Sequence, residues 1–160
     1  MTQRIVIDLA QQHLLLWQGE QLLADYDISS AEAGAGEQQG SGCTPRGKHY
    51  IRAKIGEGLP EYAVLRGRRF TGEVWDEEQS RLSPERDWIL SRILWLCGLE
   101  PGFNRGGSVD SMRRFIYIHG TPDTEPMGIP RSHGCIRMRN RDVIDLFDRV
   151  DAGCPVLITE

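Results

Sequence analysis

The sequence predicts a mainly β domain, a sandwich or barrel, with one inserted helix and a second short helix near the C-terminal end. Short runs that alternate between apolar and polar residues recur along the chain, separated by turns that contain Gly, Pro or Asn. No internal repeat or linker divides the 160 residues, a length that fits one domain. The chain is 39% hydrophobic and 26% charged, which is typical of a soluble globular protein. We therefore expect residues 1–160 to form a single domain.

The N-terminal half is predicted to be strands and loops. Residues 29–43 are rich in Ser, Ala, Gly and Glu and predict a surface loop, which ends at the turn Thr44-Pro45-Arg46-Gly47. A hairpin turn is expected at Gln18-Gly19-Glu20. The predicted strands of this half are Arg4–Leu9, His13–Trp17, Leu22–Ile28, Lys48–Lys54, Ala63–Leu65 and Arg69–Trp75.

The inserted helix is predicted to begin at Ser83-Pro84-Glu85, which combines a capping hydroxyl, a first-turn proline and an early acid. It is expected to run to Cys97 and to stop at Gly98. An apolar stripe at helical spacing, which we expect to pack in the core or alternatively to wall the active site, consists of Trp88, Ile89, Ile93 and Leu96.

The C-terminal third is predicted to contain a strand at Arg114–His119, then a long loop at Gly120–Pro130. A short helix follows, capped by Asn140 and ended by Gly153, before a final strand at Pro155–Thr159. The residues expected on one side of that helix are Val143, Ile144, Phe147 and Val150.

The charge pattern limits the classes of partner. A net charge of −4 gives no electrostatic reason to expect nucleic acid or an anionic membrane. The basic segment Arg66-Gly67-Arg68-Arg69 is interpreted as a solvated loop. No apolar run is long enough for an export signal or a membrane span, so we expect a cytoplasmic monomer, or a periplasmic protein if a signal peptide has been removed.

Cys43, Cys97, Cys135 and Cys154 form no CxxC pair and are expected to be free thiols. We expect Cys97 and Cys154 to be buried, and Cys43 to lie in the Gly-rich loop with access to solvent. Only Cys135 has polar neighbours of the kind that catalysis uses.

The segments His119-Gly120-Thr121-Pro122 and Arg131–Arg137 contain the parts of a thiol acyl-transfer site. A nearby histidine, His119 or His133, can take the thiol proton and return it to a leaving group. Gly134 allows backbone N–H groups to approach a carbonyl that develops negative charge. Two alternatives stay open, a zinc site with His49 as a further ligand and a purely structural cluster.

These residues resemble the signature of the L,D-transpeptidase catalytic domain, or YkuD, family. The signature is a histidine, a spacer, and then Ser132-His133-Gly134-Cys135-Ile136-Arg137 in this chain. Two further segments are similar to the family's opening hairpin and its turn and strand, Gln12–Gly19 and Thr44–Ile51. The resemblance covers most of the chain and implies a YkuD-like β-sandwich or barrel, with a short helix after the cysteine.

The resemblance also implies a role for each matching residue. Cys135 is expected to be the nucleophile that forms a thioester, and His119 the proton carrier, oriented by a carbonyl near Gly120. His133 and Gly134 are expected to shape the nucleophile turn and the oxyanion hole. The other expected contributors are Ser132 as a brace, Arg137 as the partner of a substrate carboxylate or of a structural ion pair, and Tyr117 and Thr121 as pocket lining.

The implied substrate is a peptidoglycan tetrapeptide or muropeptide, cleaved between meso-diaminopimelate and D-Ala, with no cofactor or metal. The apparent lack of an export signal and the expected helix-loop lid at about 83–108 favour water as the acceptor, and therefore an L,D-carboxypeptidase of cell-wall recycling. The alternatives are an L,D-transpeptidase that forms 3-3 cross-links in the periplasm, and a non-catalytic muropeptide- or zinc-binding module. Because its nucleophile is a thiol, we also expect acylation of Cys135 by carbapenems.

Overall fold

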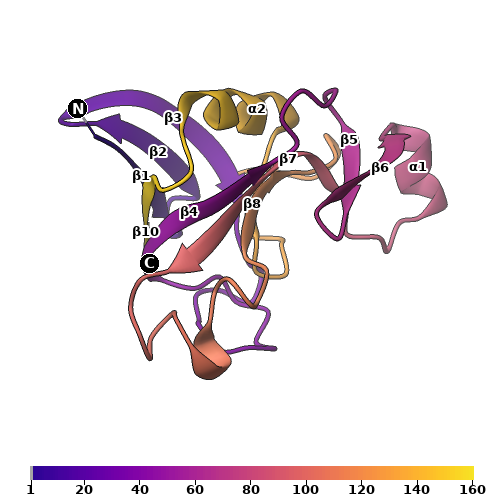
Figure 1. Cartoon of the computed structure of the whole chain (residues 1–160). Helices are drawn as coiled ribbons and strands as arrows, with labels where there is room; N and C mark the ends of the chain where they lie inside the picture. Colours follow the sequence, from indigo (N-terminus) through magenta and orange to yellow (C-terminus); the bar gives the residue numbers. More distant parts are fainter. Residues whose placement is uncertain (1) are drawn as a thin grey trace.

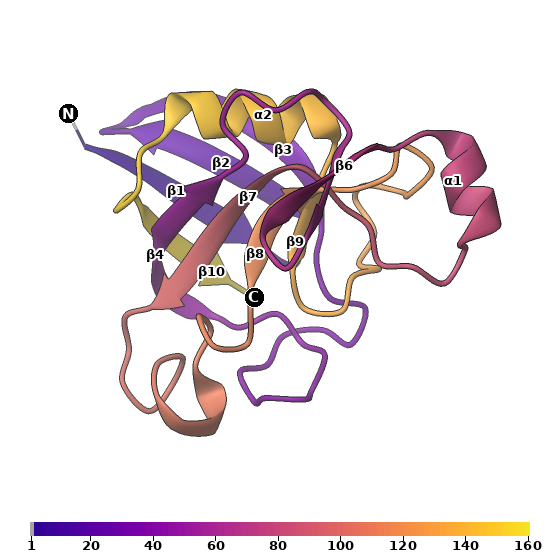
Figure 2. The same cartoon turned by 45° about the vertical axis from the view of Figure 1, so that its right-hand side comes forward.

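A computed structural model describes residues 2–160, and Figures 1 and 2 show its arrangement from two directions. Strands dominate this part of the chain, with two α-helices and one short 3-10 helix. The elements are β1 (Gln3–Asp8), β2 (His13–Gln18), β3 (Gln21–Ser29), β4 (Gly47–Ile55), β5 (Ala63–Arg66), β6 (Arg69–Val74), α1 (Glu77–Leu82), β7 (Ile89–Gly98), η1 (Gly107–Val109), β8 (Tyr117–Gly120), β9 (Ile136–Met138), α2 (Asn140–Arg149) and β10 (Pro155–Thr159).

The strands close into a barrel. The order β4-β10-β1-β2-β3-β9-β8-β7 returns on itself because β7 also pairs with β4, from His49 opposite Gly98 to Ile55 opposite Ile93. The pairs β1–β10 and β8–β9 are parallel, whereas the other neighbours are antiparallel. Closure leaves no free edge around this ring. The predicted mainly β, barrel-like fold is therefore confirmed.

Every second residue of the barrel strands points inward, and these residues fill the barrel interior. Ile5, Ile7, Leu14, Leu16 and Ile28 are fully buried there, as expected for period-two strands with one apolar face. Helix α2 lies across one opening of the barrel (Figure 1) and contributes Val143, Leu146, Phe147 and Val150 to the same core. The predicted C-terminal helix and final strand are thus present.

The β5–β6 hairpin and α1 extend sideways from β7, away from the barrel (Figure 1). Helix α1 begins after Asp76, whose carboxylate accepts a hydrogen bond from the Gln79 N–H at 3.0 Å. Every residue of β6 is exposed. A separate small cluster of Val64, Trp75, Trp88 and Leu90 joins this extension to β7.

The predicted inserted helix over Ser83–Cys97 is wrong. Its second half is β7, which pairs with β4, β5 and β8 and forms part of the barrel wall, so the lid expected at 83–108 is not a helix-loop unit. A strand that is buried on both faces is apolar almost throughout, and its sequence is hard to distinguish from a buried helix. Trp88, Ile93 and Leu96 are buried as expected, but they belong to three different clusters. Ile93 and Leu96 lie on opposite faces of β7, and Trp88 precedes the strand.

Two details of the C-terminal helix also differ from the prediction. Asn140 is the first residue of α2, not its cap, and its side chain bonds to Ser91 and to the Thr121 carbonyl. The helix ends at Arg149, before Gly153. Tertiary partners therefore decide what Asn140 does, although an amide residue at this position is a common helix-start signal.

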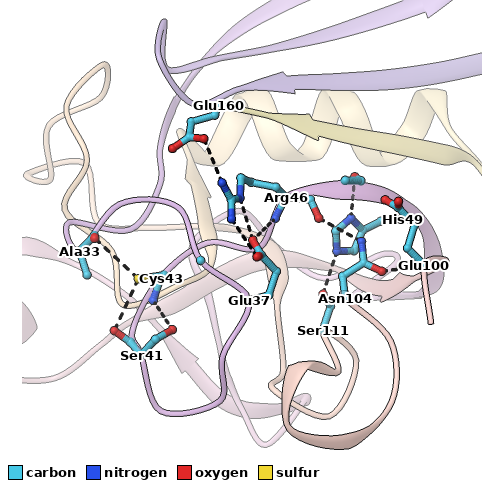
Figure 3. A network of polar contacts seen from close by, with 12 residues as sticks. Ala33, Glu37, Ser41, Cys43, Arg46, His49, Glu100, Asn104, Ser111 and Glu160 are labelled. Atoms are coloured by element: carbon cyan, nitrogen blue, oxygen red, sulfur yellow. Dashed lines mark hydrogen bonds and ion pairs between the residues drawn. The ribbon is translucent and has the colours of Figure 1, made fainter. Parts of the chain in front are cut away.

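Loops 30–46 and 99–111 lie against each other at the opposite side of the barrel from α2, and polar contacts fix both (Figure 3). Arg46 lies between Glu37 and Glu160, with its closest carboxylate oxygens at 2.9 and 3.0 Å. His49 contacts Ser111 Oγ at 2.8 Å and the Gly47 carbonyl at 3.0 Å. Within residues 2–160, no helix is long and apolar enough to cross a membrane.

Candidate active site

The parallel pair β8–β9 separates the barrel core from a second face. Ile118 lies opposite Ile136 in the register, and both side chains are in the barrel core. The alternate residues of the same two segments therefore face away from the core, and these are Tyr117, His119, Cys135 and Arg137. The period of two brings together the chemically active side chains of two segments that are 16 residues apart.

Cys135 is half-buried at the N-terminal end of β9, packed against a cluster that includes Ile93 and Tyr117. Its Sγ accepts a hydrogen bond from the Tyr117 backbone N–H at 3.4 Å and lies 3.4 Å from the Phe115 carbonyl, to which the thiol donates. Burial raises the pKa of Cys135 to about 11, although the Tyr117 N–H acts in the opposite direction. Cys135 is therefore a neutral thiol at neutral pH.

His119 is buried on β8, and its Nδ1 lies 2.6 Å from the Gly120 carbonyl oxygen. Because a carbonyl only accepts hydrogen bonds, Nδ1 carries the proton and Nε2 is left as the basic nitrogen. Burial lowers the pKa of His119, while Asp87 acts to raise it. The imidazole is therefore neutral and is able to accept a proton.

The turn before Cys135 is held by two hydroxyl groups. Ser132 Oγ accepts from the Gly134 N–H at 3.2 Å and donates to the Cys135 carbonyl at 2.5 Å. Thr44 Oγ1 donates to the Gly134 carbonyl at 2.9 Å. Gly134 has φ +131°, and an added Cβ would lie 3.3 Å from the Cys43 carbonyl oxygen, so both conformation and space favour glycine.

Arg137 points from β9 to two carboxylates. Its guanidinium lies 3.1 Å from Asp87 and 3.7 Å from Glu125, and its side chain is only 8% exposed. These contacts match the structural ion pair that the sequence left as an alternative for this residue. His133, by contrast, is 75% exposed and lies 3.9 Å from the same Asp87.

Tyr117 is connected to the tip of the β5–β6 hairpin. Its hydroxyl accepts a 3.0 Å hydrogen bond from Arg68, whose guanidinium also lies over the rings of Trp95 at 4.6 Å and Phe115 at 5.2 Å. Arg68 is therefore half-buried by these contacts. The interpretation of this segment as a solvated loop is right for the exposure of Arg66 and Arg69, but these two residues are the paired strand ends of a hairpin whose turn is Gly67-Arg68.

Gly120 and Thr121 lie where the His119 strand meets α2. The Asn140 amide donates to the Thr121 carbonyl at 2.8 Å, and a Cβ at Gly120 would come within 2.5 Å of Asn140 Oδ1 and of the Leu90 carbonyl. Thr121 is buried. The backbone after His119 is thus fixed by close packing at a glycine.

Sequence reasoning missed three contributors to this site, Asp87, Arg68 and Asn140. Asp87 and Arg68 lie on segments distant from Cys135 in sequence, and Asn140, although five residues after Cys135, acts through partners that no local motif marks. The zinc alternative is not favoured by geometry, because both ring nitrogens of His49 contact Ser111 and Gly47. Among residues 2–160 no group of three or more His, Cys, Asp or Glu side chains could hold a metal ion.

A cavity of about 410 Å³ opens beside Cys135. It is lined by Gln39, Gly40, Gly42, Arg113, Arg114, Phe115, Ile116, His133 and Cys135. A second cavity of about 410 Å³ lies at Thr121–Asp123 and Arg139–Arg141 and is not lined by Cys135. The first cavity places an open, ligand-sized space directly at a thiol that has a turn of backbone donors beside it.

Comparison with known proteins points to one family. The family profile described as the L,D-transpeptidase catalytic domain, YkuD, matches residues 2–158. Residues of the chain are 47% identical over 47 positions to the putative L,D-transpeptidase YqjB of Bacillus subtilis, a match that covers 29% of this chain and 27% of that protein.

Solved structures share the fold. An L,D-transpeptidase from Mycobacterium smegmatis superimposes with a TM-score of 0.57 at 19% identity, covering 99% of this chain and 58% of that chain. L,D-transpeptidase 3 from Mycobacterium tuberculosis, solved in complex with a faropenem-derived adduct, gives a TM-score of 0.58 at 16% identity, with 99% and 60% covered. The chain thus spans less than two thirds of the length of these relatives.

Proposed function

The chain belongs to the L,D-transpeptidase catalytic domain family, and from this membership we propose that it is a cysteine-dependent L,D-carboxypeptidase acting on peptidoglycan tetrapeptides. The observation that carries the proposal is the arrangement of Cys135 between the Tyr117 N–H and the Phe115 carbonyl, with neutral His119 on the neighbouring strand. This arrangement supplies a nucleophile, a base and a backbone donor on one face of the sheet.

In the proposed reaction, Cys135 Sγ attacks the carbonyl at the L-centre of meso-diaminopimelate. The thiol proton passes to His119 Nε2, and the new oxyanion is stabilised by backbone N–H groups of the Gly134–Cys135 turn. Because Ser132 Oγ already occupies the Gly134 N–H, we assign the Cys135 N–H as the donor. The C–N bond then breaks, and His119 returns its proton to the amine of the departing D-Ala.

Water is the proposed acceptor of the thioester. Cross-linking requires two stem peptides to be seated at one thioester, whereas hydrolysis requires one peptide and water. A cavity of about 410 Å³ is lined by Cys135, and the cavity at Thr121–Asp123 does not reach this residue. This division of space supports hydrolysis of a monomeric peptide.

Arg137 and Asp87 are proposed to hold the active-site loops together. The Arg137–Asp87 ion pair connects β9 to the segment before β7. The Arg137–Glu125 contact connects β9 to the loop that follows His119 as well. In this role Arg137 positions the turn, and it does not need to touch the substrate.

The proposal is tested by incubating the protein with a free tetrapeptide that ends in diaminopimelate and D-Ala, followed by mass analysis of the products. We expect tripeptide and D-Ala, and no turnover by a C135A variant. Cross-linked dimers as the sole product would contradict the carboxypeptidase assignment, and undiminished turnover by C135A would contradict the nucleophile.

The second candidate, L,D-transpeptidation, is favoured by the names of the relatives. It is distinguished in the same assay by adding a second stem peptide that has a free side-chain amine. A dimer yield that rises with the amine at the expense of tripeptide would assign the chain to that activity.

A further inference from the structure

The cavity beside Cys135 is cationic, although the chain has a net charge of −4. Arg113 and Arg114 line it, together with neutral side chains, backbone and the imidazole of His133. Its lining includes no Asp or Glu. An electropositive wall beside a nucleophile attracts and orients an anionic group of a ligand.

Arg114 is half-buried without a counter-ion. Its Nη2 donates to the Cys43 carbonyl at 2.7 Å, and Nη1 donates to the carbonyls of Glu37 at 3.1 Å and Gly36 at 3.4 Å. No ion pair of residues 2–160 includes Arg114 or Arg113. Burial lowers the pKa of Arg114, while the charge of Glu37, which is itself paired with Arg46, acts to raise it.

Arg137 differs from Arg114 in this respect. It is the arginine that the signature marks for a substrate carboxylate, but Asp87 and Glu125 already neutralise it. Its side chain is 8% exposed and does not line the cavity at Cys135. The cation available to a ligand in this cavity is therefore Arg114, which makes no ion pair.

Arg114 is also close to the reacting atoms. A Cβ added to Gly134, the residue before the nucleophile, would lie 4.0 Å from Arg114 Nη2. The next residue after Arg114 is Phe115, whose carbonyl accepts a hydrogen bond from the Cys135 thiol. The guanidinium therefore adjoins the place where the acylating residue of a substrate would be held.

We propose that this cavity is a carboxylate subsite for the acyl donor, in which Arg114 binds the second carboxylate of the diamino acid and Arg113 supports it at the rim. The inference rests on the proposed function and defines its substrate as a donor with a free acid at this position. A guanidinium has five N–H donors, so three bonds to carbonyls leave donors for a carboxylate. Arg114 is in this view a specificity-determining residue.

The loop that Arg114 touches has other anchors, so a substitution there leaves the loop in place. The Glu37 carboxylate makes two 2.9 Å contacts with Arg46 (Figure 3), and the Gln39 N–H donates to the Ser108 carbonyl at 2.7 Å. R114Q removes the charge while it keeps an amide that can donate to the Cys43 carbonyl.

The experiment compares two donors, one tetrapeptide with a free side-chain carboxylate on diaminopimelate and the same peptide with that group as a primary amide. We expect kcat/KM for the acid to exceed that for the amide by about tenfold, as for a hydrogen bond to a charged group. In R114Q the ratio of kcat/KM for the acid to kcat/KM for the amide should fall to about one. R114K should restore part of this ratio, because lysine returns the positive charge without the two-pronged donor geometry of a guanidinium.

R69Q is the matched control, because it removes the same charge from an exposed residue that does not line the cavity, and it should keep the wild-type ratio. A wild-type ratio near one would overturn the inference and leave the proposed function standing. An equal loss for both donors in R114Q, with the ratio unchanged, would also overturn it, since that is the result of a purely structural clamp. Cleavage of neither donor by the wild type would overturn the proposed function and this inference with it.

Discussion

The Tyr117 backbone N–H donates a hydrogen bond to Cys135 Sγ across 3.4 Å, between two segments that are 18 residues apart in sequence. The contact exists because β8 and β9 are parallel neighbours, so the start of one strand faces the residue that precedes the other. A backbone donor at this position stabilises the thiolate more than the thiol, since an N–H favours the charged form of sulfur. It therefore assists proton removal from a cysteine whose burial opposes ionisation.

A carbapenem should acylate Cys135. A strained lactam carbonyl reacts with the thiol and remains attached as a thioester, which intact mass spectrometry detects as one adduct per chain. C135S should show no such adduct, whereas C43S should retain it, because the side-chain hydrogen bonds of the Cys43 thiol go to the carbonyls of Ala33 and Ser41 and include no basic group. An adduct that maps to Cys43 would contradict the assignment.

Alkylation of Cys135 by iodoacetamide should depend steeply on pH. Because the pKa of Cys135 is raised to about 11, the thiolate fraction rises by about tenfold per pH unit between pH 7 and 9, and the rate should follow it. Peptide mapping separates Cys135 from the other thiols. A rate that is independent of pH in this range would show a preformed thiolate–imidazolium pair instead.

The acid limb of the pH profile of kcat/KM should lie below pH 6.5. Burial lowers the pKa of His119 below its ordinary value, so the imidazole remains neutral and basic as the pH falls through 6.5. The measurement is the initial rate of D-Ala formation at low substrate concentration between pH 4.5 and 8. A limb centred above pH 6.5 would mean that another group limits the reaction.

D87N should lower the free energy of unfolding by about 1–2 kcal/mol, because it removes the ion pair of Arg137. This value lies between those of exposed and buried ion pairs, since Asp87 is half-exposed and Arg137 is buried. Urea unfolding measures this change. E32Q is the control, since both partners of its 3.8 Å pair with Arg131 are exposed, and it should change stability by less than about 0.5 kcal/mol.

D87N has a second expected effect, on the nucleophile. The charge of Asp87 raises the pKa of Cys135, so its removal should lower that pKa and speed alkylation at a fixed pH. A slower reaction in D87N would show that loss of loop order outweighs the charge effect.

R68G should be more stable than R68A by about 1 kcal/mol. Arg68 has φ +64° beside Gly67 in the two-residue turn of the β5–β6 hairpin, a left-handed conformation that costs a residue with a Cβ roughly 1 kcal/mol. Both variants lose the same contacts with Trp95 and Tyr117, so their difference in urea unfolding isolates the backbone effect. Equal stabilities would contradict the strain.

Local patterns in the sequence determined much of this protein. Alternation predicted the opening strands, the strand of β4 and the final strand, because a half-buried strand must present one apolar and one polar face. The segment from Ser132 to Arg137 marked the turn of the proposed nucleophile, in which Ser132 bonds to the Gly134 N–H and to the Cys135 carbonyl, because these residues are close together in the chain.

Only the tertiary structure decided the rest. Residues 89–98 are a strand and not a helix because three other strands, β4, β5 and β8, pair with this segment, and no local period reveals that pairing. Arg137 is neutralised by Asp87, 50 residues away, whereas Arg114 is left unpaired beside Cys135. Charge pairing depends on distance in space, so a sequence that singles out Cys135 cannot show which arginine near it is left without an ion pair.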